Sequence, residues 1–270
     1  MNNSLSRIVI TGASSGIGKA IASRLSHAGS TIANLDRLDG TETSSRCAGR
    51  FQTIQVDLSD AQAIPRAFND VDTFFGGKSP DVLVCCAALS RPAQFLDVSV
   101  SDLDLMMAVN IRGTFIACQQ AGLRMRRAGR GRIVIITSIC ALQGWAQESV
   151  YCMTKAAQQA MVQSLAVELA PHGILVNGVA PGLISSAGDS MAKTRSDPHV
   201  YQHDMERTSL GRFGTAEEVA EAVAYLTTVT WMTGQSLVID GGFMATGLGY
   251  LGESREKLIA KTGPRGHENS

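Results

Sequence analysis

Short apolar runs alternate along the chain with longer segments of helical periodicity. The strand-sized runs lie at 7–11, 31–35, 51–56, 81–86, 132–137, 174–179 and 236–239. Between them, apolar residues recur every three or four positions, as at Ile17, Ile21 and Leu25, which indicates amphipathic helices. Strands that alternate with helices of this length predict an α/β fold in one domain: a doubly wound, seven-stranded parallel sheet with helices on both faces and right-handed crossovers.

Two segments between the strands stand out. A long helix is predicted from Ser101 to about residue 128, with Ser101 as its N-cap and Asn110 near its middle. Residues 183–214 are polar and irregular, which is long for a connection in a compact domain and predicts a lid or substrate-binding loop. We expect one domain over residues 1–242 and a C-terminal extension over 243–270.

Composition narrows the class of protein. The chain has 270 residues, 44% of them hydrophobic, and 24 basic side chains balance 24 acidic ones, so no charge excess favours nucleic acid or a membrane surface. Six cysteines show neither zinc nor disulfide spacing, and no apolar run reaches about 18 residues. We therefore expect a cytoplasmic protein with reduced thiols that acts on a small molecule and binds neither nucleic acid nor membrane.

A glycine-rich turn follows the first predicted strand. Gly12, Gly16 and Gly18 stand between that strand and a helix, where backbone N–H groups and a helix N-terminus can approach an anion. The spacing Gly-x3-Gly-x-Gly differs from the Gly-x-Gly-x-x-Gly fingerprint of dinucleotide-binding proteins. A cofactor pyrophosphate fits this turn, and a purely structural turn is the alternative.

Acidic residues end the second and third predicted strands. Asp36 comes 20 residues after Gly16, where a carboxylate accepts hydrogen bonds from a ribose 2′-hydroxyl and repels a 2′-phosphate. This favours NAD over NADP, although the neighbouring Arg37 can in principle pair with a phosphate. Asp57 is a candidate contact to the adenine amino group. An ordinary turn residue at the end of a strand is the alternative for Asp36.

Tyr151 and Lys155 are the first candidates for chemistry. Four residues apart, they share one face of a helix. At about 4 Å and an effective dielectric near 20, an ammonium attracts a phenolate by roughly 4 kcal/mol, about three pKa units. The phenol would then exchange protons near neutral pH. A half-buried ring beside a solvated amine is the alternative for this pair taken alone.

Two further polar residues occupy conspicuous positions. Ser138 follows the carboxyl end of an apolar strand, where open α/β sheets present their ligand sites. Asn110 is out of place by helix propensity, so it is either buried with satisfied hydrogen bonds or a functional amide.

Together these segments resemble the classical short-chain dehydrogenase/reductase family over residues 8 to about 242. The resemblance is carried by Thr11-Gly12-x3-Gly16-Ile17-Gly18, Asp57-Leu58, Asn110, Ser138, Tyr151-x3-Lys155, Pro181-Gly182, Leu210-Gly211-Arg212, Thr233-Gly234-Gln235 and Asp240-Gly241-Gly242. It implies a Rossmann-type fold and an NAD(P)-dependent enzyme that interconverts a secondary alcohol and a ketone by hydride transfer, with NAD as the expected cofactor. It also implies a homotetramer or homodimer, packed through the helices that carry Asn110 and Tyr151.

The resemblance also implies a role for each matching residue. Tyr151 would exchange the substrate hydroxyl proton, Lys155 would lower the phenol pKa and hold the nicotinamide ribose, and Ser138 would bind the substrate oxygen. Asn110 would hold a water that links Lys155 to solvent. The other cofactor contacts it implies are Ser14, Ser15, Ile17, Arg37, Asp57, Leu58, Cys86, Ala87, Ala88, Pro181, Gly182, Ile184 and Ser186.

Two departures from the family pattern are visible. Cys85-Cys86-Ala87-Ala88 stands where the family usually has Asn-Asn-Ala-Gly, which removes side-chain amides that help to fix the adenosine contact. A tail of 28 residues follows Gly242, longer than the family usually carries.

Substrate identity is expected to depend on residues 91–95, 143–148 and 185–212. Gln143, Trp145 and Gln147, beside Ser138 and Tyr151, favour a polar substrate such as a sugar, polyol or hydroxy acid. His199 and His203 have metal-like spacing, but no further ligand motif completes a site, so no metal is expected. An NADP-dependent carbonyl reductase of the same fold and a non-catalytic dinucleotide-sensing protein remain alternatives.

Overall fold

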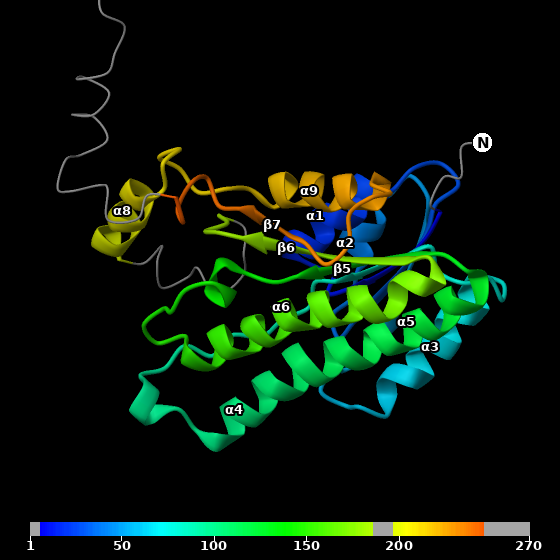
Figure 1. The fold of residues 1–270 in the computed structure, drawn as a ribbon, viewed down its shortest axis with the longest axis horizontal. Helices are drawn as coiled ribbons and strands as arrows, with labels where there is room; N and C mark the ends of the chain where they lie inside the picture. The colour runs from blue at the N-terminus through cyan, green and yellow to red at the C-terminus, as the bar shows by residue number, and fades with distance from the viewer. Residues whose placement is uncertain (1–5, 186–196, 246–270) are drawn as a thin grey trace, which may run out of the picture.

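The computed structural model describes residues 6–185 and 197–245 of the chain. One parallel sheet of seven strands, in the order β3-β2-β1-β4-β5-β6-β7, forms the centre of the protein (Figure 1). The strands are β1 (Arg7–Thr11), β2 (Thr31–Asp36), β3 (Arg50–Gln55), β4 (Val82–Cys85), β5 (Gly131–Ile136), β6 (Ile174–Pro181) and β7 (Ser236–Ile239). The predicted Rossmann-type, doubly wound parallel sheet is therefore confirmed.

Helices cover both faces of this sheet. In Figure 1, α1 and α9 lie above it, and α3, α4, α5 and α6 lie below it. The helical segments are α1 (Gly16–Leu25), α2 (Thr41–Ser44), α3 (Ala63–Phe74), η1 (Phe95–Asp97), α4 (Val100–Met106), η2 (Met107–Gly113), α5 (Thr114–Ala128), η3 (Ile139–Ala141), α6 (Ser149–Leu169), η4 (Ala170–His172), α8 (Pro198–Arg207) and α9 (Ala216–Thr228).

Each face of the sheet has its own hydrophobic core. Val9 and Leu83 pack with α3, α5 and α6, whereas Ile10 and Val84, their neighbours in sequence, pack with α1 and α9. Successive residues of a strand point to opposite faces, so a strand covered on both faces has to be apolar throughout. This explains the unbroken apolar runs in the sequence.

Strand order reverses between β1 and β4. Consecutive strands run outward from β1 to one edge of the sheet and from β4 to the other. In open α/β sheets, such a reversal leaves a crevice at the carboxyl ends of the strands, and ligands bind there. The candidate residues of the sequence analysis lie around this crevice.

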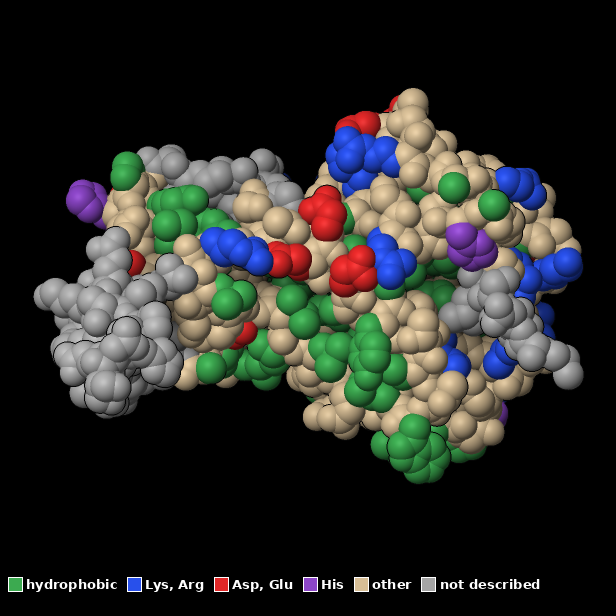
Figure 2. All heavy atoms as spheres, turned by 90° about the horizontal axis from the view of Figure 1, so that it is seen from above, with side chains coloured by type: hydrophobic (Ala, Val, Ile, Leu, Met, Phe, Trp, Pro, Cys, Tyr) green, Lys and Arg blue, Asp and Glu red, His purple; other side chains and the backbone are tan. Residues whose placement is uncertain are grey.

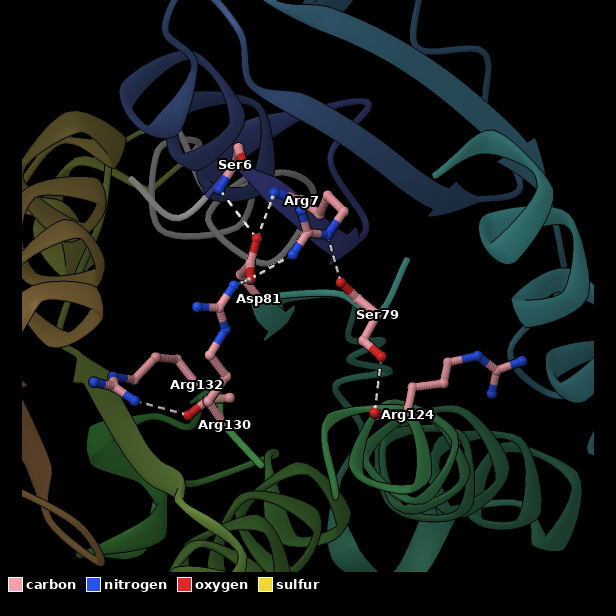
Figure 3. A network of polar contacts seen from close by, with 8 residues as sticks. Ser6, Arg7, Ser79, Asp81, Arg124, Arg130 and Arg132 are labelled. Carbon is pink, nitrogen blue, oxygen red and sulfur yellow. Dashed lines mark hydrogen bonds and ion pairs between the residues drawn. The ribbon is translucent and has the colours of Figure 1, made fainter. Parts of the chain in front are cut away.

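Asp81 joins three strands at the opposite end of the sheet (Figure 3). The side chain is 3% exposed. Its Oδ2 accepts from the backbone N–H groups of Ser6 (3.2 Å) and Arg7 (3.1 Å), and its Oδ1 from the guanidinium groups of Arg7 (2.8 Å) and Arg130 (3.2 Å). Its carbonyl oxygen accepts from the backbone N–H of Arg132 (3.0 Å). This carboxylate therefore ties the starts of β1, β4 and β5 together.

Two predictions from the sequence are wrong in detail. The long helix begins earlier, at Val100, because Ser99 rather than Ser101 is the N-cap and its hydroxyl accepts from the backbone N–H of Asp102 (3.0 Å). The segment 183–214 is not irregular throughout, because Pro198–Arg207 form α8. Asp197 caps that helix by accepting from two backbone N–H groups, and Pro198 occupies its first turn, where a proline is tolerated.

Candidate active site

The glycine turn between β1 and α1 forms a cradle of backbone groups. Gly12 has φ +78°, and its N–H donates to the carbonyl of Leu35 (3.0 Å). A Cβ on Gly18 would lie 2.0 Å from the carbonyl oxygen of Gly12, so only glycine fits there. Ser15, the N-cap of α1, makes no side-chain cap bond, which leaves the first-turn N–H groups for another acceptor. The cradle fits a dinucleotide pyrophosphate.

Side chains from β2 hold this turn in place. Asp36 Oδ2 accepts from the backbone N–H of Ser14 (3.0 Å), and its Oδ1 accepts from that of Leu38 (3.1 Å). Asn34, buried within β2, accepts at Oδ1 from the backbone N–H of Ala13 (2.8 Å) and donates from Nδ2 to Ser14 Oγ (2.9 Å). The carboxylate of Asp36 thus lies at the carboxyl end of β2 beside the cradle, where the ribose argument places it.

Arg37 and Asp57 lie next to this carboxylate. Arg37 Nη1 is 4.0 Å from Asp57 Oδ2, and the Arg37 side chain is 68% exposed. Asp57 Oδ1 also accepts from the backbone N–H of Ser59 (2.8 Å). Leu58 is buried, and its carbonyl oxygen lies 2.8 Å from where a Cβ on Gly113 would be.

The cysteine-bearing segment after β4 keeps the backbone position that the usual amides would help to fix. Thr11 Oγ1 accepts from the backbone N–H groups of Cys86 (3.1 Å) and Ala87 (3.2 Å). A Cβ on Gly12 would lie 2.8 Å from the Cα of Ala87, so this segment packs directly on the glycine turn. Burial raises the pKa of the Cys86 thiol to about 12. The segment therefore still presents its backbone beside the cradle, and the thiol of Cys86 is neutral.

Asn110 lies in η2, a π-helical segment between α4 and α5, and is fully buried. Its Oδ1 accepts from the backbone N–H of Leu89 (2.8 Å), and its Nδ2 donates to the carbonyl of Leu89 (2.8 Å) and to Thr154 Oγ1 (3.1 Å). π-helical turns inside helices are rare, and those that occur are often at functional sites. The amide therefore joins the loop after β4 to α6, the helix that carries Tyr151.

Ser138, Tyr151 and Lys155 lie together at the carboxyl end of β5. Ser138 Oγ accepts from the backbone N–H of Cys140 (3.1 Å). Lys155 is 2% exposed, and its Nζ donates to the carbonyl of Ile136 (2.8 Å) and lies 5.5 Å from the centre of the Tyr151 ring. Strand β5 and helix α6 thus bring a hydroxyl, a phenol and an ammonium into one place.

The charges at this site differ from the sequence prediction. Burial lowers the pKa of Lys155 to about 8. Burial also raises the pKa of Tyr151 above its ordinary value; Cys140 and the Glu148 carboxylate add to that shift, and a hydrogen bond with Ser138 opposes it. The expected lowering of the phenol pKa by Lys155 is therefore wrong for the protein by itself, because desolvation outweighs the ammonium. Near neutral pH the phenol is therefore protonated and the amine charged, and the amine loses its charge as the pH rises through about 8.

The segment after β6 lies at the carboxyl end of the sheet. Pro181 ends β6, and the N–H of Gly182 donates to the carbonyl of Ile239 (2.9 Å). A Cβ on Gly182 would lie 2.8 Å from the Cα of Asp240. Ile184 is buried, whereas Ser186 lies outside the described residues.

The predicted substrate residues lie in the loop between η3 and α6. Gln143 is half-buried, and Gln147 is exposed with φ +66°; the carbonyl of Gln147 accepts from the backbone N–H of Ala93 (2.9 Å). Trp145 stacks on Phe243, with ring centres 5.4 Å apart. The loop is thus joined to the chain after β4 and to the chain after β7.

Three side chains at the site were not singled out from the sequence. Ser90 Oγ donates to Glu148 Oε2 (2.7 Å), which puts a carboxylate one helical turn before Tyr151. Gln158 Oε1 accepts from Lys155 Nζ (2.9 Å). Phe243 is buried, and the guanidinium carbon of Arg207 lies 4.5 Å from the centre of its ring. The spacing of Gln158, three residues after Lys155 on one helix, was a signal that could have identified it.

The part of the chain that the structure describes contains neither a metal-ligand cluster nor a membrane-spanning helix. Within residues 6–185 and 197–245, no three His, Cys, Asp or Glu side chains group as metal ligands do. Over the same ranges, no helix is both long and apolar enough to cross a bilayer.

The sheet, the glycine cradle and the Ser138, Tyr151 and Lys155 cluster define a doubly wound protein of the dinucleotide-binding type, with a hydroxyl, a phenol and an ammonium at the end of β5. The family model described as enoyl-(acyl carrier protein) reductase matches residues 12–244. Among curated relatives, 3-oxoacyl-[acyl-carrier-protein] reductase from Aquifex aeolicus is 33% identical over 242 residues, 87% of this chain and 95% of the relative. L-xylulose reductase from Mesocricetus auratus is 34% identical over 246 residues, 89% and 97% of the two chains.

Solved structures agree with these sequence matches. The crystal structure of a candidate 2-deoxy-D-gluconate 3-dehydrogenase from Agrobacterium tumefaciens with bound NADP has a TM-score of 0.81 at 29% identity. The match covers 90% of this chain and 100% of that one. The chain therefore belongs to the short-chain dehydrogenase/reductase family of oxidoreductases.

Proposed function

We propose that this protein is an NAD(H)-preferring dehydrogenase/reductase that interconverts a secondary alcohol and a ketone. The observation that carries the proposal is the cluster of Ser138, half-buried Tyr151 and buried Lys155 at the carboxyl end of β5. Ser138 binds the substrate oxygen, Tyr151 exchanges its proton, and Lys155 supplies the charge that favours the phenolate. When bound, the nicotinamide accepts or supplies the hydride. Gly12, Gly18 and Asp36 hold its adenosine diphosphate half.

The position of Asp36 supports NAD. A carboxylate at the end of β2 repels a 2′-phosphate and accepts from a 2′-hydroxyl. The second candidate is an NADP-dependent reductase, because the Agrobacterium structure holds NADP and the exposed Arg37 is next to Asp36. We expect NADH to bind more tightly than NADPH and Asp36→Ser to reverse that order. Tighter NADPH binding by the wild-type protein in a fluorescence titration would favour the second candidate.

A polar substrate fits the acceptors at the mouth of the site. The Glu148 carboxylate, held by Ser90, lies close enough to Tyr151 to raise the pKa of the phenol, and it provides acceptor oxygens for hydroxyl groups. Sugars and polyols present such groups beside the reacting carbon. A hydroxy acid fits less well, because its carboxylate would repel that of Glu148.

A homodimer or homotetramer is proposed from exposed apolar side chains on α5 and α6. Phe115 and Leu123 on α5 and Met153 and Val167 on α6 are exposed although large and hydrophobic. A second apolar area lies at the other side of the sheet, where Trp231 is 100% exposed. Figure 2, which views the face with α1 and α9, shows hydrophobic side chains exposed together. Contiguous areas of this kind mark interaction surfaces, and a monomer by light scattering would contradict the proposal.

The working compartment is proposed to be the cytoplasm. All six cysteines are free thiols, including Cys85 and Cys118, whose sulfur atoms lie 3.7 Å apart. Reduced thiols are typical of a reducing compartment. Fractionation that recovers the protein outside the cytoplasm would contradict this.

The decisive experiment compares Tyr151→Phe with Tyr225→Phe, a control at an exposed position on α9. A panel of polar secondary alcohols and ketones is assayed with both cofactors. We expect Tyr151→Phe to lose at least about a hundredfold in kcat while it still binds NADH, because proton transfer contributes about that much. Unchanged turnover in Tyr151→Phe, or no turnover of any panel compound by the wild type, would refute the proposed function.

A further inference from the structure

Gln158 connects the catalytic lysine to the π-helical segment. It lies on α6, three residues after Lys155, and is 1% exposed. Its Oε1 accepts from Lys155 Nζ (2.9 Å), and its Nε2 donates to the carbonyl of Asn110 (2.7 Å) and to Thr114 Oγ1 (3.1 Å). Only one orientation of the amide satisfies all three partners, because an ammonium only donates and a carbonyl only accepts.

The ammonium of Lys155 is held by two neutral acceptors. Of its three N–H donors, one goes to the carbonyl of Ile136 (2.8 Å) and one to Gln158 Oε1. The third remains for the side of Tyr151, whose ring centre is 5.5 Å from Nζ. The two acceptors come from different elements, the end of β5 and the next turn of α6. They therefore fix both the place of the ammonium and the direction of its free donor.

Gln158 joins Asn110 to Lys155 through direct hydrogen bonds, because its amide bridges the Asn110 carbonyl and Lys155 Nζ. An amide donates at nitrogen and accepts at oxygen but does not exchange protons readily. The bridge therefore holds the lysine in place and does not pass its proton on.

We propose that Gln158 is a positioning residue of this site, whose side-chain amide ties the Lys155 ammonium to the π-helical segment at Asn110 and keeps it charged beside Tyr151. The inference rests on the proposed function for its catalytic meaning, since only a proton-transferring Tyr151 needs that charge. The hydrogen bonds themselves do not depend on the identity of the substrate.

The other titratable groups that face Lys155 are one phenol and three thiols. Tyr151 faces it from α6, Cys85 and Cys86 from the end of β4, and Cys140 from η3. The thiols are neutral near pH 7, because burial raises the pKa of Cys86 and of Cys140 to about 12. The Glu148 carboxylate faces Tyr151 on the substrate side and is not among the groups that shift the pKa of Lys155.

Two substitutions with opposite expected effects test the proposal. Gln158→Met keeps the length of the side chain and removes the acceptor, so the pKa of Lys155 should fall by about one unit, the effect of one hydrogen bond to a charged group. Gln158→Glu puts a carboxylate against the ammonium, so the pKa should rise by about one unit or more. The matched control is Gln163→Met, at an exposed glutamine of the same helix, which should leave the pKa unchanged.

The first measurement needs no substrate. The 13Cε resonance of Lys155, assigned with Lys155→Arg, is followed by NMR against pH in the cofactor-free protein, and the melting temperature of each variant is recorded. The second is the pH profile of kcat, in which the limb near pH 8 should move with the Lys155 titration. A purely structural role for Gln158 would lower stability or kcat equally at every pH.

The outcomes separate the two proposals. Opposite shifts in Gln158→Met and Gln158→Glu, with none in Gln163→Met, support the positioning role. An unchanged Lys155 titration in both Gln158 variants, or shifts of the same sign, overturns it. If the wild type turns over no panel compound while the Lys155 shifts are observed, the proposed function fails, whereas Gln158 still positions the lysine.

Discussion

Burial of the Lys155 charge should leave a measurable mark on the stability of the protein. The ammonium is 2% exposed, and burial lowers its pKa from 10.5 to about 8. At about 1.4 kcal/mol per unit, the native state then disfavours the charge by about 3 kcal/mol relative to the unfolded chain. We predict that replacement by Met, which has a similar length and no charge, removes the pH-dependent part of this penalty.

The sign follows from proton binding. Between about pH 8 and pH 10.5, the unfolded chain keeps the Lys155 proton and the native state has lost it, so the free energy of unfolding rises with pH. For this shift, about 2 kcal/mol is regained between about pH 7 and pH 9.5. Lys155→Met lacks this gain. Lys155→Met also loses the hydrogen bonds to Ile136 and Gln158. Their loss has nearly the same effect at both pH values, so it shifts the stability difference between the two proteins but not its dependence on pH.

Urea unfolding at a fixed protein concentration measures this difference. The free energies of unfolding of wild type and Lys155→Met are compared near pH 7 and near pH 9.5, without cofactor. The free energy of unfolding of the Met variant minus that of wild type should be about 2 kcal/mol larger near pH 7 than near pH 9.5. Tyr151 and the thiols are present in both proteins, so to first order their titration cancels. A difference that stays constant over this range would refute a buried, charged Lys155.

Two further predictions follow from the geometry. Ketone reduction should fall above about pH 8, because Lys155 loses there the charge that stabilises the phenolate left when Tyr151 gives its proton to the substrate; initial rates across a pH series measure this limb. At the other end of the sheet, Asp81→Ala should lower the free energy of unfolding by about 3 kcal/mol in urea, because the buried carboxylate satisfies two guanidinium groups and two backbone N–H groups. The control Glu221→Ala, which removes an exposed 2.6 Å ion pair with Arg24, should cost much less.

The inner strands of the sheet were predictable because both of their faces are covered, as at Val82–Cys85. The edge strand Ser236–Ile239 is only partly buried, yet its short apolar run between turn residues was sufficient. Helix ends were less predictable, because they depend on single hydrogen bonds. Ser99 and Ser101 are both good N-cap residues, and only the folded geometry shows that the Ser99 hydroxyl accepts from Asp102. Helix α8 was missed because its sequence is polar on most sides.

The members of the site were predictable as residue types, but their charges were not. Tyr151 and Lys155 share a helix face by spacing alone, and the estimate of a lowered phenol pKa followed from charge attraction at close range. Whether attraction or desolvation wins depends on burial, which local spacing does not reveal. The spacing of Gln158 from Lys155 was a signal, but its role also depends on burial and on the Asn110 carbonyl, 48 positions away in sequence, which spacing does not reveal.

The site therefore contains a buried ammonium, which is unfavourable by itself, and hydrogen-bond acceptors for it that come from separate parts of the chain. An ammonium that is 2% exposed persists because the carbonyl of Ile136 and the amide of Gln158 replace water around it. The Asn110 side chain in turn holds Leu89 and Thr154, so the π-helical segment supports both the lysine and the loop after β4. Removing either amide should thus act on the charge of Lys155 as well as on packing, and the two effects are separable because only the first depends on pH.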